Sequence, residues 1–189
     1  MTGRSGRSGR SGRSGSPSPS NPAPPDPVAR LRRSWRFLRR LPGGAWLFSK
    51  MVGRAAPYTG TIKARVEELD EGYARLTMRD RKAVRNHLRS IHAVAQLNLA
   101  EETSGLAVVF SMPPGHRGIP VRLEIDYLKK ARGTLTAECR VPGGIAPIPE
   151  GEEDRELEVE VTVQDPHGET VSEARARWVM GRQPAASTR

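Results

Sequence analysis

The chain has 189 residues, enough for one well-buried domain with tails and too few for two full-sized domains. Its net charge of +10 is concentrated in residues 1–56, which carry 12 Lys or Arg against Asp26 alone. Residues 57–189 carry 19 basic and 20 acidic residues and are nearly neutral. A protein that reads nucleic-acid sequence needs a basic folded face, so we expect no specific nucleic-acid partner.

The single cysteine, Cys139, excludes an internal disulfide and a cysteine-based zinc site. No run of about 18 consecutive apolar residues occurs, which argues against a membrane-spanning helix. The arginines near the N-terminus precede no apolar stretch of the kind found in secretory signals. These features predict a cytoplasmic protein in a reducing compartment.

Residues 1–27 repeat Gly-Arg-Ser and continue in Ser and Pro, with too little apolar area to offset the entropy of ordering. We expect a disordered basic tail. Residues 28–56 are predicted to hold an amphipathic helix and a linker, because Leu31, Trp35 and Leu38 recur at helical spacing among six arginines. The helix is expected to cover an edge of its own domain, and peripheral contact with an anionic membrane is the weaker alternative.

From Tyr58 onward apolar and polar residues alternate with the period of two that is typical of strands. Two strands, at 62–67 and 74–79, precede a helix. Five more are predicted after it, at 106–112, 121–127, 134–141, 156–163 and a last run to about residue 180. A curved antiparallel sheet wrapped around one central helix is therefore the expected α+β fold of residues 57–181, with residues 182–189 as a C-terminal tail.

The predicted central helix lies within the segment from Asn86 to Gly105, NHLRSIHAVAQLNLAEETSG. Seven of the ten residues from Ile91 to Ala100 are apolar, and the paired acids Glu101 and Glu102 follow them. Ionised groups are costly to bury without a partner or a task, so a carboxylate in a buried helix is a candidate functional group.

This layout resembles the hotdog-fold thioesterases, in particular the phenylacetic-acid-degradation type and a related uncharacterised branch. In better-known members an Asn lies six residues before a His at the helix start, and an acid lies nine residues after that His. Asn86, His92 and Glu101 have this spacing. Ala93 and Val94 stand where those members have two glycines.

The first amides of a helix have no acceptor within the helix and lie at the positive end of its dipole, so they stabilise a carbonyl oxygen that gains charge. Ala93 and Val94 are the candidate amide donors, and the Asn86 side chain is a third. Glu101 is the candidate base that activates water or the nucleophile that attacks the thioester carbon. Glu102 takes this role if the helix register differs by one residue.

Helical geometry separates the two halves of this site. Nine residues place Glu101 about 13.5 Å along the helix from His92 and about half a turn around it. One chain cannot bring them together, so we predict a two-fold homodimer with composite sites, and a tetramer remains open.

Further basic residues are candidates for the phosphates of coenzyme A or for an acidic carrier protein. Lys129, Lys130 and Arg132 are the preferred ones, because adjacent strand residues point to opposite faces. His92 is assigned to substrate binding or to a structural hydrogen bond. His87 and His92 lack a further ligand pattern, so we expect no metal and no cofactor.

The leading interpretation is an acyl-CoA-type thioester hydrolase. The alternative is a non-catalytic acyl-binding or dimerisation module of the same fold, which the missing glycines at Ala93 and Val94 favour. Fold alone does not choose between them.

Overall fold

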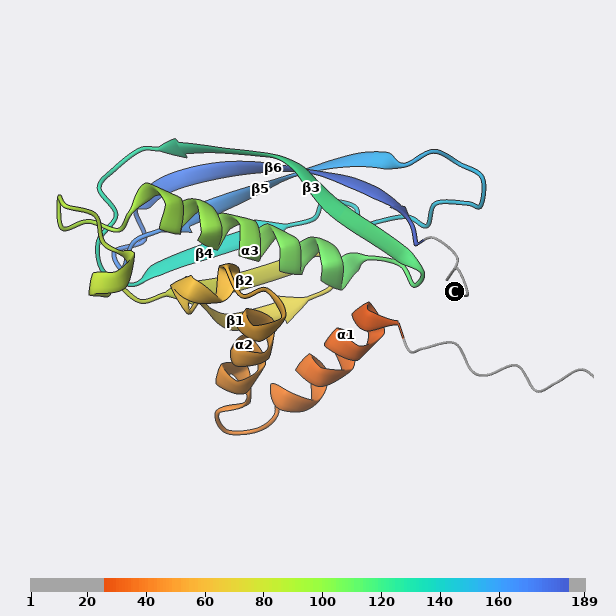
Figure 1. Cartoon of the computed structure of the whole chain (residues 1–189), viewed down its shortest axis with the longest axis horizontal. Coiled ribbons are helices and arrows are strands. Elements are labelled where there is room, and N and C mark those ends of the chain that lie inside the picture. Colours follow the sequence, from red (N-terminus) through yellow and green to blue (C-terminus); the bar gives the residue numbers. More distant parts are fainter. Residues whose placement is uncertain (1–25, 184–189) are drawn as a thin grey trace, which may run out of the picture.

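A computed structural model describes residues 26–183 (Figure 1). The tails expected at 1–27 and 182–189 therefore lie almost wholly outside the described residues. The elements, in chain order, are α1 (Pro27–Leu38), α2 (Gly44–Ala55), the 3-10 turn η1 (Thr59–Ile62), β1 (Arg65–Asp70), β2 (Tyr73–Met78), the 3-10 turn η2 (Lys82–Val84), α3 (Ala93–Ser111), β3 (His116–Tyr127), β4 (Leu135–Arg140), β5 (Arg155–Gln164) and β6 (Thr170–Arg182).

The six strands form one antiparallel sheet in the order β1-β2-β4-β5-β6-β3. Alternate side chains of these strands point inward and are fully buried, as at Leu76, Ala137 and Val161. The strands curve past α3, which runs along the inner side of the sheet (Figure 1). The predicted α+β hotdog architecture, a curved antiparallel sheet around one central helix, is confirmed.

The central helix is longer than expected, because α3 continues through Gly105 to Ser111. The strand predicted at 106–112 is therefore wrong, and the sheet has six strands rather than seven. A helix buried on nearly all sides carries no polar stripe, so a short apolar run within it resembles a strand buried on both faces. Gly105 serves close packing here, since a Cβ at this position would lie 3.4 Å from the Trp178 ring.

The amphipathic helix expected within residues 28–56 is α1, which ends at Leu38 before the Pro-Gly-Gly segment. It covers its own domain, as expected. The Trp35 indole nitrogen donates to the Leu69 carbonyl at 2.6 Å, and the Arg32 guanidinium donates to the Phe110 and Met112 carbonyls at the end of α3.

The linker expected up to residue 56 is instead a second helix, α2. Its Phe48 is completely buried, and the Phe48 ring packs on the Trp35 ring with 5.0 Å between the centroids. The two helices form a hairpin that packs beside β1 at one edge of the sheet (Figure 1). No helix within residues 26–183 is long and apolar enough to cross a membrane.

Candidate functional site

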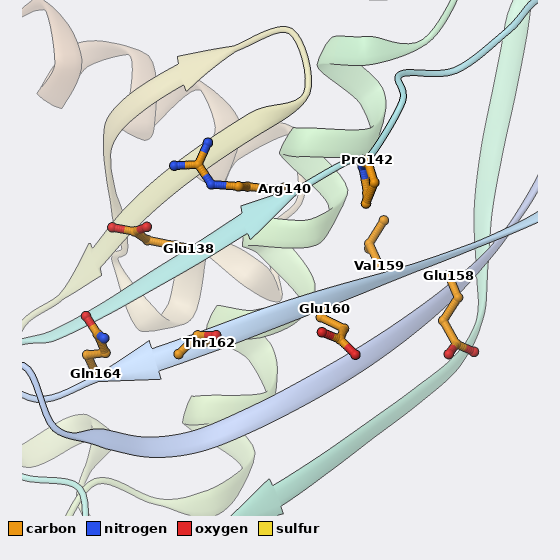
Figure 2. Close-up of a pocket in the computed structure, with 8 residues that line it drawn as sticks. All are labelled: Glu138, Arg140, Pro142, Glu158, Val159, Glu160, Thr162 and Gln164. Carbon is orange, nitrogen blue, oxygen red and sulfur yellow. The ribbon is translucent and has the colours of Figure 1, made fainter.

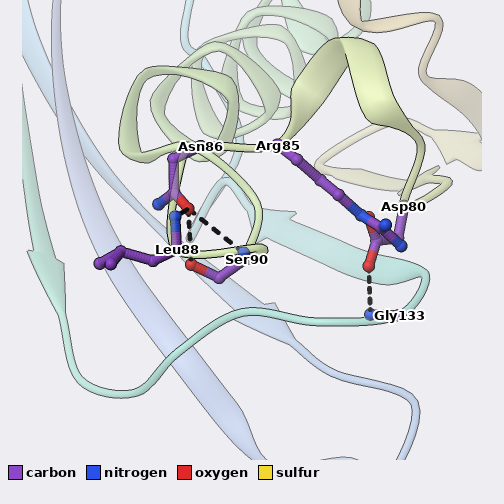
Figure 3. A network of polar contacts seen from close by, with 6 residues as sticks. All are labelled: Asp80, Arg85, Asn86, Leu88, Ser90 and Gly133. Carbon is purple, nitrogen blue, oxygen red and sulfur yellow. Dashed lines mark hydrogen bonds and ion pairs between the residues drawn. The ribbon is translucent and has the colours of Figure 1, made fainter.

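Asn86 organises the turn that leads into α3. Its side-chain oxygen accepts hydrogen bonds from the Leu88 N–H at 2.9 Å and from the N–H and hydroxyl of Ser90, both at 3.2 Å (Figure 3). These bonds use the carbonyl oxygen of the side-chain amide. The backbone N–H of Asn86 donates to the Ser90 carbonyl at 2.8 Å, whereas the side-chain nitrogen Nδ2 makes no hydrogen bond to any residue in 26–183, so this side-chain donor is open to a ligand.

The segment that leads into α3 is also hydrogen-bonded to the connection that follows β3. Asp80 accepts hydrogen bonds from Arg85 at 2.6 Å and from the Gly133 N–H at 3.1 Å (Figure 3). The bonded Arg85 guanidinium holds the pKa of the Asp80 carboxyl below its usual value. The Ile91 N–H donates to the Ala131 carbonyl at 2.8 Å. The start of α3 and residues 128–134 therefore lie side by side.

His92 is the N-cap of α3. Its Nδ1 atom accepts the hydrogen bond of the Val94 N–H at 3.1 Å, which requires the ring proton on Nε2. Val94 was expected to be one of two amides open to a carbonyl oxygen. A ligand must displace the imidazole to reach it, whereas the Ala93 N–H makes no hydrogen bond to any described residue.

Glu101 lies on the least buried stripe of α3, which recurs every four residues at Ala93, Leu97, Glu101, Gly105 and Val109. It is the one carboxylate in that otherwise apolar stripe. Burial raises the pKa of Glu101, and a hydrogen bond from Thr59 partly opposes this rise. A carboxyl whose pKa is raised towards neutrality is better suited to proton transfer near pH 7 than an ordinary surface carboxyl.

Glu102 is the deeper acid, with 6% of its surface exposed. Burial, reinforced by the charge of Glu101, raises the pKa of Glu102 to about 8. Its Oε2 atom has no hydrogen-bond partner among the described residues. The side chain lines a pocket of about 430 Å³ beneath α2, together with Trp46, Ser49, Lys50, Gly53, Arg54, Gly60, Lys63, Ala64 and Arg65.

Sequence reasoning missed this pocket because it treated residues 45–56 as a linker. The available signal was the spacing of Phe48 and Val52 on one side of a helix, with Lys50 and Arg54 on another. The pocket places basic side chains around an acid that is neutral at pH 7.

The start of α3 and Glu101 are nine residues apart on one continuous helix, so a single chain does not bring them together. Asn86, His92 and Ala93 gather at one end, and Glu101 lies in the middle of the helix.

Lys129, Lys130 and Arg132 are all exposed. The argument from adjacent strand residues is wrong for the two lysines, because β3 ends at Tyr127 and both lie in the connection beyond it. Lys129 forms an ion pair with Glu169 at 3.0 Å. The connection that holds them lies beside the start of α3, so the basic side chains border the end of the helix that Asn86 precedes.

A hollow of about 500 Å³ lies on the outer face of the sheet (Figure 2). It is lined by outward-pointing residues of β4 and β5, among them Glu138, Glu158 and Glu160. These acids repel an anionic substrate, and α3 lies on the other face of the sheet. Residues 26–183 contain no group of three or more His, Cys, Asp or Glu that could hold a metal ion.

Comparison with known proteins places this geometry in a recognised group. A family model described as a domain of unknown function, DUF4442, matches residues 44–180. The match begins at α2 and ends within β6, so it includes the pocket, the central helix and all six strands. No protein with a curated description matches the chain.

Several solved structures share the fold. A structural-genomics target described as APC5556 is 28% identical, with a TM-score of 0.67 over 82% of this chain and 99% of that one. PA5026 from Pseudomonas aeruginosa, described as a probable thioesterase, is 21% identical, with a TM-score of 0.62 over 76% and 97%. A hypothetical thioesterase with coenzyme A from Streptococcus pneumoniae is 17% identical, with a TM-score of 0.55 over 70% and 99%.

Proposed function

The chain belongs to the DUF4442 family, and from this premise we propose that it is an acyl-thioester hydrolase acting on acyl-CoA-type substrates. The observation that carries the proposal is Glu101, a half-buried carboxyl with a raised pKa on the half-exposed stripe of the central helix. Thioesterases among the solved structures of the same fold support the reaction class.

In this mechanism the thioester carbonyl lies at the start of α3, where the Asn86 amide and the Ala93 N–H polarise it. Glu101 of the other subunit takes a proton from water as the water oxygen attacks the thioester carbon. The helix start stabilises the negative oxygen of the tetrahedral intermediate. The carbon–sulfur bond then breaks, and the proton held by Glu101 passes to the leaving thiolate.

A second subunit is required because Glu101 and the helix start are far apart in one chain. The proposed contact is the β3 edge, which has no neighbouring strand on its outer side within the described residues. Ile119 and Val121 on this strand are about half exposed, and Val94 at the helix start is similarly exposed. Apolar residues on an open edge favour pairing with a second copy, and a two-fold axis makes both sites equivalent.

The carrier end of the substrate is proposed to lie along the connection after β3. Lys130 and Arg132 there are free of ion pairs with described residues and border the helix start, so they suit the phosphates of coenzyme A. His92 is positioned to contact substrate once its ring leaves the Val94 N–H. The finer resemblance to the phenylacetic-acid-degradation type stays a prediction.

The rival proposal is a non-catalytic acyl-binding or dimerisation module. It is favoured by the engaged Val94 N–H and by Ala93 and Val94 in place of glycines. The deciding experiment measures hydrolysis of a panel of acyl-CoA thioesters by the native chain and by Glu101→Gln and Glu102→Gln. Catalysis by Glu101 predicts a loss of about 100-fold or more in kcat for Glu101→Gln and a smaller loss for Glu102→Gln.

Equal near-background rates for all three proteins, together with saturable acyl-CoA binding, would establish the binding module. The reverse order of losses would make Glu102 the base.

A further inference from the structure

The α1–α2 hairpin exposes large apolar side chains near its turn. Phe37, Leu41, Trp46 and Leu47 are 64%, 45%, 56% and 42% exposed. They lie within ten residues of one another around the turn that joins the helices. That turn is at the lower end of the molecule in Figure 1, away from α3 and the sheet. We call these four residues the hairpin tip.

Unpaired positive charge surrounds the hairpin tip. Seven exposed basic residues in the hairpin form no ion pair with any described acid: Arg30, Arg33, Arg36, Arg39, Arg40, Lys50 and Arg54. The only acid of residues 26–56 is Asp26, which caps the far end of α1. On α1, Arg30, Arg33 and Phe37 share the face opposite the buried Val28 and Trp35.

Exposed apolar and basic side chains also lie together on α2. Leu47, Lys50, Met51 and Arg54 share one exposed face at helical spacing, whereas Phe48 on a neighbouring side of the helix is buried. The Lys50 ammonium lies 5.0 Å from the centre of the Trp46 ring. An aromatic ring with an adjacent cation suits a boundary between an apolar and a charged medium.

We infer that the hairpin tip is a docking surface for an anionic lipid membrane, with the aromatic and aliphatic side chains in the headgroup–acyl boundary and the arginines on the lipid phosphates. One amphipathic helix of this length binds membranes weakly, and two joined at an apolar turn double the contact. The arginine cluster disfavours a second copy of this chain as the occupant, because like charges would face each other. The β3 edge proposed for dimerisation lies at the opposite edge of the sheet from β1 and α2.

The inference is tested by sedimenting the full chain with vesicles of pure phosphatidylcholine and of phosphatidylcholine mixed with phosphatidylglycerol. We expect binding only to the anionic vesicles, and less binding as salt is added. Trp35 and Trp178 are buried, so Trp46 is the exposed tryptophan of the three and its emission should shift to shorter wavelength on binding.

Two double variants keep this fluorescence reporter. Phe37→Ser with Leu47→Ser and Arg36→Gln with Arg40→Gln should each lower the partition coefficient by about tenfold or more. The matched charge control, Arg175→Gln with Arg177→Gln on the outer face of β6, should leave it unchanged.

Three results would overturn the inference. One is no binding to anionic vesicles. Another is unchanged binding by the Phe37→Ser, Leu47→Ser variant. The third is complete loss of binding when Arg4, Arg7, Arg10 and Arg13 of the full chain are changed to Gln, since the tail alone would then account for it. None of these readouts involves thioester hydrolysis, so the inference stands or falls separately from the proposed function.

Discussion

Nδ1 of His92 accepts the hydrogen bond of the Val94 N–H, two residues further along the chain. The residue that caps the central helix therefore occupies one of the two amides first expected to receive a thioester carbonyl. The Ala93 N–H and the Asn86 side chain are the donors left for it in the proposed mechanism.

Restoring space at the helix start should raise the hydrolysis rate. The double variant Ala93→Gly, Val94→Gly removes the two side chains at the helix start, and neither belongs to the core. We expect kcat/KM for acyl-CoA to rise by about tenfold, because a carbonyl oxygen can then approach the donors more closely. Each glycine should lower the free energy of unfolding by about 1 kcal/mol at most. An unchanged kcat/KM would show that these side chains do not limit access.

Mixing two inactive variants should restore activity. Asn86→Ala removes a group at the helix start, and Glu101→Gln removes the base that the other subunit supplies. A heterodimer of the two contains one intact composite site, so an equal mixture after subunit exchange should recover about a quarter of the native rate. The steady-state rate after co-expression measures this. A mixture as inactive as its components would rule out sites shared between subunits.

Charge on the β3 edge should separate the subunits. Ile119→Lys with Val121→Lys places two like charges opposite their copies at the proposed contact. We expect light scattering to report a monomer, and kcat to fall by about 100-fold or more because Glu101 of the other subunit is lost. The outer-face pair Glu158→Lys, Glu160→Lys on β5 controls for added charge and should leave the native mass unchanged.

Glu102 should make the protein less stable as the pH rises. Its folded pKa of about 8 lies above the value of an exposed glutamate, so the unfolded chain releases this proton at lower pH than the folded chain. The contribution is fully present at about pH 4 and is lost progressively up to about pH 8. Glu102→Gln, which stays neutral, should raise Tm at pH 8 by about 5 °C and flatten the dependence of Tm on pH. Glu71→Gln is the exposed control and should leave the profile as in the native chain.

The two aromatic residues of α1 should differ sharply in their effect on stability. Trp35→Ala removes a buried ring and its hydrogen bond to Leu69, and should lower the free energy of unfolding by about 3–5 kcal/mol. Phe37→Ala, two residues away and exposed, should change it by less than about 0.5 kcal/mol. Urea unfolding followed by circular dichroism measures both. Similar losses for the two variants would mean that Phe37 is also buried in solution.

Strand alternation predicted a strand near each of the six that form the sheet, because side chains on the outer face of β4 to β6 are polar and those on the inner face are apolar, but a seventh predicted strand proved to be helix. The length of α3 was not predictable by the same means. Leu106 and Phe110 are buried on one side of the helix and Val108 on the other, so no apolar stripe marks this run as helical. Gly105 was interpreted as a terminus, whereas its role is to admit the Trp178 ring.

The candidate site was predictable only in part. The spacing of Asn86, His92 and Glu101 came from the sequence, and the acid's position on a half-exposed stripe agrees with the role proposed for it. The pocket beneath α2 depends on contacts between segments far apart in the chain, between Glu102 and residues near Trp46. Local patterns carry no information about such contacts. The same is true of the bond between His92 and Val94, which depends on the rotamer of one side chain.

Gly105 sets the space between the central helix and the Trp178 ring. A methyl group there would meet the ring at 3.4 Å, which is an ordinary van der Waals contact, so we expect an alanine to fit with little adjustment. Glu101 lies one turn earlier on the same stripe of α3. A small side chain at Gly105 therefore offers a way to change the packing beside the carboxylate while every group of the proposed site keeps its chemical identity.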